Sequence, residues 1–162
     1  MTASQTFNAL FLCTGNSARS QIAEALLNHM SKGRFHAYSA GSHPAATVQP
    51  LAAQLISELG QDASRLRPKS WDEFVGPGAP KMDFIITVCD NAAGETCPVW
   101  AGRPAVAHWG VPDPAKNPAE SKGFKDAWLT LRRRVELLLA LPVEKLDHLA
   151  REQELRLIGK EV

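Results

Sequence analysis

The sequence lacks several features that would place a protein in a class at once. Its 18 basic and 17 acidic residues leave a net charge of +1, so the protein has no overall positive potential that would attract nucleic acid or an acidic membrane surface. No apolar run approaches the length of a membrane span, and the first residues, MTASQ, lack the basic start and apolar core of an export signal. We therefore expect a cytoplasmic protein whose partners include neither nucleic acid nor a membrane.

Cysteine is also scarce: the chain of 162 residues contains three, Cys13, Cys89 and Cys97. An odd number of cysteines without an export signal argues against a framework of structural disulfides and favours reduced, reactive thiols. The sequence contains no Cys-x-x-Cys pair and no closely spaced cysteine and histidine, which disfavours a zinc site. We expect no bound cofactor, and we expect the thiols to be the reactive groups.

What the sequence contains is ordinary for one globular domain: 44% of the residues are hydrophobic and 22% are charged. Four short apolar segments have the composition of buried strands, namely 7–13, 36–40, 84–89 and 105–109. Helical periodicity marks three segments between and after them, namely 20–32, 49–59 and 124 to about 142. This alternation predicts an α/β fold with a parallel sheet and helices on both faces, because parallel strands need crossover connections.

Helical periodicity continues beyond residue 142. We divide the chain into a catalytic domain, residues 1–142, and a C-terminal helical extension, residues 143–162. The extension packs either against the body of the domain or against a second subunit, and the sequence leaves both arrangements open.

The segment CTGNSARS, residues 13–20, carries the chemistry. It places a cysteine at the end of a strand and an arginine where a helix begins. Backbone N–H groups of such a loop converge on one concavity and the helix dipole adds positive potential, so an anion binds there. The anion-binding candidates are Thr14, Gly15, Asn16, Ser17, Ala18 and Arg19.

Three side chains of this segment have separate roles. The loop predicts a lowered pKa for Cys13, and therefore an ionised nucleophile at neutral pH. The planar guanidinium of Arg19 matches two oxygens of a tetrahedral oxyanion, and Ser20 is placed to donate a hydrogen bond to the Cys13 sulfur. The alternative is a buried cysteine followed by an ordinary helix start, and the spacing between Cys13 and Arg19 alone does not exclude it.

Three motifs resemble, in order and spacing, those of the low-molecular-weight protein tyrosine phosphatase superfamily: FLCTGNSARSQIAEALL at 11–27, YSAGSHP at 38–44 and VPDP at 111–114. The resemblance covers nearly all of residues 7–140 and implies a four-stranded parallel sheet in the order 2-1-3-4. It also implies that Asp113, which precedes a proline, is the general acid that protonates a leaving oxygen. Taken alone, an Asp-Pro pair is as readily a turn.

Two further segments, VCDNAAGETCP at 88–98 and HWGVPDPA at 108–115, resemble the arsenate reductase branch of this superfamily. This resemblance implies a relay: arsenate forms an adduct with Cys13, Cys89 attacks that sulfur to release arsenite, and Cys97 takes over the disulfide with Cys89. In a sheet of order 2-1-3-4 the first and third strands are neighbours about 4.8 Å apart, so Cys13 and Cys89 are within reach of each other.

A reductase of this kind holds no cofactor and draws its electrons from an external thiol. Seven residues separate Cys89 from Cys97, one more than in the best-known thioredoxin-coupled members. The donor therefore stays open between a thioredoxin-type protein, a glutaredoxin and a low-molecular-weight thiol. By the same family analogy, Asn16, Glu24 and Ser39 form a polar cluster beneath the loop that is either structural or binds potassium, and no other metal is expected.

Two other functions fit the same residues. A phosphatase acting on phosphotyrosine or a small phosphoester would use Cys13, Arg19 and Asp113 on phosphate in place of arsenate. Against it, Ala115 and Lys116 stand where phosphatases of the superfamily usually carry an aromatic pair. A non-enzymatic oxyanion-binding or redox-sensing module is the third interpretation, and the joint presence of a nucleophile, an arginine and an acid disfavours it.

Overall fold

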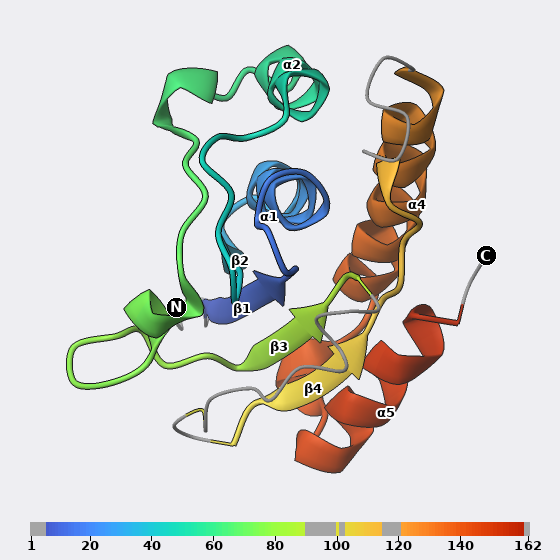
Figure 1. Ribbon diagram of the computed structural model, residues 1–162. Coiled ribbons are helices and arrows are strands. Elements are labelled where there is room, and N and C mark those ends of the chain that lie inside the picture. The colour runs from blue at the N-terminus through green and yellow to red at the C-terminus, as the bar shows by residue number, and fades with distance from the viewer. Residues whose placement is uncertain (1–5, 90–99, 101–102, 115–120, 161–162) are drawn as a thin grey trace.

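A four-stranded parallel sheet forms the centre of the protein (Figure 1). The computed structural model describes residues 6–89, 100, 103–114 and 121–160. The strands are β1 (Phe7–Leu12), β2 (Phe35–Ala40), β3 (Phe84–Thr87) and β4 (Ala105–His108). They lie in the order β2-β1-β3-β4 and every neighbouring pair is parallel, which confirms the predicted sheet.

Alternate residues of β1 fill both faces of the sheet. Ala9 and Phe11 belong to a large hydrophobic cluster on one face, whereas Leu10 and Leu12 belong to a smaller cluster on the other. All four side chains are at most 1% exposed. Burial on both faces explains why this strand appears in the sequence as a continuous apolar run rather than as an alternating one.

Helical segments lie on both faces of the sheet. The larger cluster includes side chains of α1 (Arg19–Met30), α4 (Ser121–Leu139) and α5 (His148–Ile158), together with Ala52 and Ile56 of α2 (Pro50–Glu58). Figure 1 shows α1 and α4 side by side and α5 along β4, while α2 packs on α1 and α4. On the smaller cluster lies the 3-10 helix η2 (Trp71–Phe74), through its two aromatic end residues. The described residues also form two short 3-10 helices, η1 (Ala63–Arg65) and η4 (Val143–Lys145).

The helix α1 starts at the end of the predicted loop and presents an apolar stripe to the core. Its buried apolar residues recur at helical spacing and include Ile22, Ala23, Leu26 and Leu27. The helix ends in a left-handed pair, Lys32 with φ 51° and Gly33 with φ 86°. This is a common way for a helix to stop, and it accounts for the glycine at that position.

The C-terminal helix α5 packs on the body of the domain, the first of the two arrangements that the sequence left open. Trp109 Nε1 donates to the Leu155 carbonyl oxygen at 2.9 Å inside the core. At the edge of the sheet, the Val106 N–H donates to Glu152 Oε2 at 3.0 Å, and Arg156 Nε donates to the Val106 carbonyl oxygen at 3.2 Å. The division of the chain at residue 142 stays a prediction. None of the described helices is both long and apolar enough to cross a membrane.

Candidate active site

The loop after β1 turns its carbonyl groups outward. Three of them accept hydrogen bonds from the segment that follows β2: Thr14 from His43 N at 2.9 Å, Gly15 from Ala45 N at 2.9 Å and Ser17 from Gln49 N at 2.8 Å. The peptide bonds here are trans, so the C=O of one residue and the N–H of the next point in opposite directions. The N–H groups of Gly15, Asn16 and Ala18 therefore point to the inside of the loop, as an oxyanion site requires.

Asn16 holds the loop in a left-handed turn. Its φ is 49° and its side chain is fully buried. Nδ2 donates to Ser20 Oγ at 2.8 Å, and Oδ1 accepts from Gln21 Nε2 and from the Lys69 N–H, both at 3.0 Å. The Asn16 side chain thus supports the loop from behind. The bond from Ser20 to the Cys13 sulfur stays a prediction.

Cys13 and Cys89 meet beyond the ends of the neighbouring strands β1 and β3. Both are buried, reduced thiols, and their side chains are hydrogen-bonded to each other, which confirms the predicted proximity. The Thr14 N–H donates to Cys89 Sγ at 3.4 Å, and Thr14 Oγ1 lies 3.8 Å from the same sulfur. The first residue of the oxyanion loop is therefore also a contact of the second thiol.

The pKa of the Cys13 thiol is raised, whereas the sequence predicted that it would be lowered. The hydrogen bond to Cys89 is the first cause and burial of the thiol is the second. The positive charge of Arg19 and the N–H of Gly15 act in the opposite direction and are outweighed. Arg19 and the loop N–H group therefore lower the pKa of Cys13 as predicted, but the hydrogen bond to Cys89 and the burial of the thiol raise it by more.

Arg19 joins the loop to the VPDP segment. Its Nη1 donates to the Val111 carbonyl oxygen at 2.9 Å, and its Nη2 lies 3.8 Å from Asp113 Oδ1. The Arg19 side chain is 15% exposed and that of Asp113 is 41% exposed, so the carboxylate stands at the mouth of the site and the guanidinium lies deeper. The structure thus brings together the predicted oxyanion ligand and the predicted acid, and proton transfer by Asp113 stays a prediction.

Beneath the loop, the Glu24 carboxylate lies close to the ammonium group of Lys69. Ser39 Oγ donates to Glu24 Oε1 at 3.1 Å, and Lys69 Nζ lies 3.9 Å from the same oxygen. Burial raises the pKa of Glu24 and lowers that of Lys69, and the partner's charge opposes the shift in each case. Of the predicted polar cluster, Glu24 and Ser39 are in contact, while the Asn16 side chain bonds elsewhere. Potassium binding stays a prediction.

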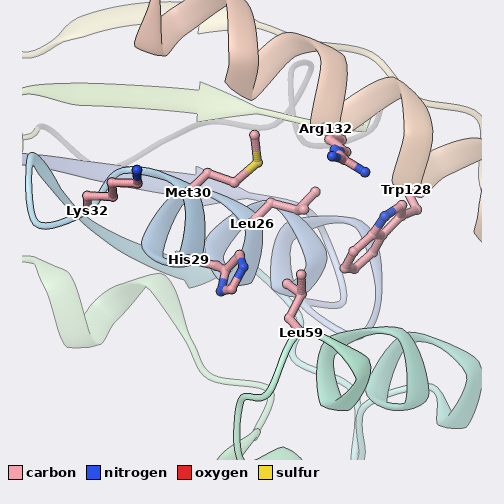
Figure 2. A pocket seen from close by; sticks show the side chains of 7 residues that line it. All are labelled: Leu26, His29, Met30, Lys32, Leu59, Trp128 and Arg132. Atoms are coloured by element: carbon pink, nitrogen blue, oxygen red, sulfur yellow. The ribbon is translucent and has the colours of Figure 1, made fainter.

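A groove of about 370 Å³ lies at the opposite end of α1 from Arg19 (Figure 2). Its lining residues are Leu26, His29, Met30, Lys32, Leu59, Trp128 and Arg132. Figure 2 shows Trp128 and Arg132 reaching it from α4, across from the α1 side chains. Among the residues that the structure describes, no cysteine and no predicted site residue lines this groove.

Some predicted positions lie outside the described residues, namely Cys97, Ala115 and Lys116. Conversely, Gln21 and Lys69 belong to the support of the loop although the sequence did not single them out. Gln21 is part of the quoted motif, directly after Ser20, and that was the available signal. Lys69 carries no local signal, because its contacts to Asn16 and Glu24 join distant parts of the chain.

Comparison with known proteins agrees with this geometry. Residues 8–154 match the family of low molecular weight phosphotyrosine protein phosphatases. The arsenate reductase of Shouchella clausii is 36% identical over 124 residues, which cover 76% of this chain and 83% of that protein. The crystal structure of arsenate reductase from Archaeoglobus fulgidus matches with a TM-score of 0.66 at 32% identity, over 82% of this chain and 99% of that chain. The thioredoxin-dependent arsenate reductase of Corynebacterium glutamicum matches with a TM-score of 0.59 at 28% identity, over 83% of this chain and 61% of that chain. The loop, the paired thiols and these matches together show that the chain belongs to the low molecular weight phosphotyrosine protein phosphatase family.

Proposed function

We propose that the protein is an arsenate reductase in which Cys13 is the nucleophile and Cys89 is the first resolving thiol. The observation that carries this proposal is the hydrogen-bonded pair of buried, reduced thiols at the oxyanion loop. Hydrolysis of a phosphoester transfers no electrons and needs one nucleophile, whereas reduction of arsenate needs two thiols to supply two electrons. Relatives named arsenate reductase, found by sequence and by structure, support the same choice.

In the first step the Cys13 sulfur attacks the arsenic atom of arsenate, which the loop N–H groups and Arg19 hold. Because the pKa of Cys13 is raised, its proton leaves during this step, and an oxygen of dianionic arsenate is a suitable acceptor. A sulfur–arsenic bond forms and an arsenic–oxygen bond breaks. The oxygen leaves as water after Asp113 supplies a second proton.

In the second step Cys89 loses its proton to an oxygen of the arsenic adduct, and the resulting thiolate attacks the Cys13 sulfur. The sulfur–arsenic bond breaks and its electron pair stays on arsenic, which leaves as arsenite, while the two thiols become a disulfide. The Thr14 N–H that donates to Cys89 Sγ at 3.4 Å favours negative charge on that sulfur and keeps it beside Cys13.

Cys97 then attacks Cys89 and frees Cys13, and an external dithiol reduces the new disulfide. We propose a thioredoxin-type protein as this donor, and with it a cytoplasmic location, since that compartment keeps such dithiols reduced. The name of the Corynebacterium glutamicum relative supports the donor.

Phosphatase activity is the second function that the geometry supports. The pair formed by Arg19 and Asp113, 3.8 Å apart, is equally suited to hold a phosphoester and to protonate its leaving group. It would share the nucleophile Cys13 and would not need Cys89.

The test supplies arsenate with one of three electron donors: thioredoxin with thioredoxin reductase, glutaredoxin with glutathione and glutathione reductase, or glutathione with glutathione reductase. NADPH oxidation reports turnover in each. Hydrolysis of p-nitrophenyl phosphate is assayed in parallel. Cys13→Ser should abolish both activities, whereas Cys89→Ser should stop reduction and leave any hydrolysis intact. Reduction by Cys89→Ser at the wild-type rate would contradict the intramolecular relay, and hydrolysis with no reduction in any donor system would establish the phosphatase instead.

A further inference from the structure

Gln21 carries an amide whose contacts the proposed mechanism does not yet explain. It lies in the first turn of α1 and is fully buried. Its Nε2 is within hydrogen-bond distance of the Asn16 carbonyl oxygen at 3.2 Å, of Asn16 Oδ1 at 3.0 Å and of the Arg67 carbonyl oxygen at 2.9 Å. Its Oε1 is also buried and has no hydrogen-bond partner among the described residues.

These contacts fix the orientation of the amide. If it were turned over, Oε1 would face three acceptor oxygens and every one of the bonds would be lost. An unsatisfied buried carbonyl group is unfavourable, and an apolar side chain of similar length, such as methionine, would not create one. What a glutamine contributes at this position is therefore its donor group.

This donor completes the set of contacts behind the loop. Backbone N–H groups hold the carbonyl oxygens of residues 14, 15 and 17 from outside, and Gln21 Nε2 holds the carbonyl between them, that of Asn16. Since the peptide is trans, holding the Asn16 C=O outward turns the Ser17 N–H inward. The same amide binds the Asn16 side chain, which supports a φ of 49° that non-glycine residues seldom adopt. All the N–H groups of residues 15–18 then face the inside of the loop.

We propose that Gln21 is a positioning residue for oxyanion binding, whose amide fixes Asn16 so that the Ser17 N–H points at the bound oxyanion. The identity of that oxyanion as arsenate rests on the proposed function. The contact with Arg67 adds a second constraint, because it ties the loop to the segment that leads to η2.

The first test compares Gln21→Met with Asn28→Leu in the full-length, thiol-reduced protein. Asn28 is a matched control on the same helix, where its side chain bonds the N–H and C=O of Ala37 at 2.8 and 3.0 Å, outside the loop. Calorimetric titration measures the affinity for inorganic phosphate, and steady-state assays measure KM and kcat for arsenate. Gln21→Met should bind phosphate about tenfold more weakly, as expected for the loss of one hydrogen bond, and should raise KM more than it lowers kcat. Asn28→Leu should bind phosphate as the wild type does.

The second test uses the protonation of Gln21→Glu. As a carboxylate, the substituted side chain has only acceptor oxygens, which would face the acceptor oxygens of Asn16 and Arg67. When it is protonated, it regains one O–H donor. Its phosphate affinity, as a ratio to that of the wild type, should therefore recover as the pH is lowered toward about 5. A packing defect would not produce this pH dependence.

Each outcome bears on the proposal. Wild-type phosphate affinity in folded Gln21→Met, or a pH-independent ratio for Gln21→Glu, would overturn it. If Gln21→Met does not fold, the pH dependence of Gln21→Glu decides. If the wild type binds phosphate and Gln21→Met weakens that binding, but no donor supports arsenate reduction, the positioning role stands and the proposed function fails.

Discussion

Gly41 lies against the carbonyl oxygen of Thr14: a Cβ atom at residue 41 would be 2.4 Å from that oxygen and 2.5 Å from the carbonyl oxygen of Cys13. Both are backbone atoms, which cannot rotate out of the way. The residues that follow Gly41 include His43 and Ala45, whose N–H groups hold the loop carbonyls. The close contact at Gly41 therefore sets the position of the loop relative to the end of β2.

Gly41→Ala should displace the oxyanion loop. We expect a loss of about 2–4 kcal/mol in the free energy of unfolding, together with loss of phosphate binding. Gly60→Ala is the control: Gly60 has φ 90° and no heavy atom within 4 Å of its Cβ position, so the cost should be about 1 kcal/mol with unchanged phosphate binding. Urea unfolding and phosphate titration measure both effects. Equal losses in the two variants would show that Gly41 is an ordinary turn glycine.

Cys89→Ala, which cannot form a side-chain hydrogen bond, should lower the pKa of Cys13. The hydrogen bond to Cys89 is the first cause of the raised pKa, so its removal leaves burial opposed by Arg19 and by the Gly15 N–H. The thiolate fraction of Cys13 at neutral pH should rise. The rate of alkylation of Cys13 by iodoacetamide against pH, followed by mass spectrometry, gives the pKa directly. Cys97→Ala keeps Cys89 and should keep the raised pKa. A Cys13 pKa in Cys89→Ala at or above the wild-type one would contradict the assigned cause.

Arg19→Lys should lower kcat/KM for arsenate by about 10²–10³-fold, because lysine keeps the charge but loses the planar pair of donors. Arg34→Lys is a matched change outside the site. The Arg34 Nη1 donates to the Leu139 carbonyl oxygen at 2.8 Å, as Arg19 does to Val111, so that variant reports the cost of losing guanidinium contacts outside the site. Its kcat/KM should stay near the wild-type value. A loss in Arg19→Lys no larger than in Arg34→Lys would show that Arg19 does not bind the oxyanion.

Lys69→Met should make stability depend on pH. Without the ammonium, the pKa of Glu24 should rise further, so the folded state binds more protons than the unfolded state and stability falls as the pH increases. We expect a loss of about 1–3 kcal/mol at pH 7 that diminishes in acid and is recovered in the double variant Glu24→Gln, Lys69→Met. Urea unfolding at several pH values measures it.

The exposed ion pair between Arg67 and Glu73 is the control for this prediction, with 2.7 Å between Arg67 Nη2 and Glu73 Oε1. Arg67→Met should cost less than about 1 kcal/mol and show little dependence on pH. A pH-independent loss in Lys69→Met would mean that Glu24 is stabilised by groups other than Lys69.

Local features of the fold and of the site could be predicted from the sequence, whereas contacts between distant segments could not. The apolar run before Cys13 and the periodicity after Arg19 are properties of neighbouring residues, and both elements form as predicted. The contact from Gln21 to the Arg67 carbonyl spans 46 residues and leaves no local pattern. The predicted direction of the Cys13 pKa shift was wrong for the same reason, since the prediction included the loop and Arg19 but not the hydrogen bond to Cys89. The sheet order came from the family resemblance rather than from periodicity.

The contacts of α5 with Val106 have a consequence for how the molecules behave toward one another. The edge of a sheet normally offers unpaired N–H and C=O groups to a strand of another chain. At Val106 both groups are already bonded, to Glu152 and Arg156, so a foreign strand aligned with β4 would find neither a donor nor an acceptor at that residue. Helix α5 thus blocks strand addition at this position of β4, through side chains that take no part in the chemistry of Cys13.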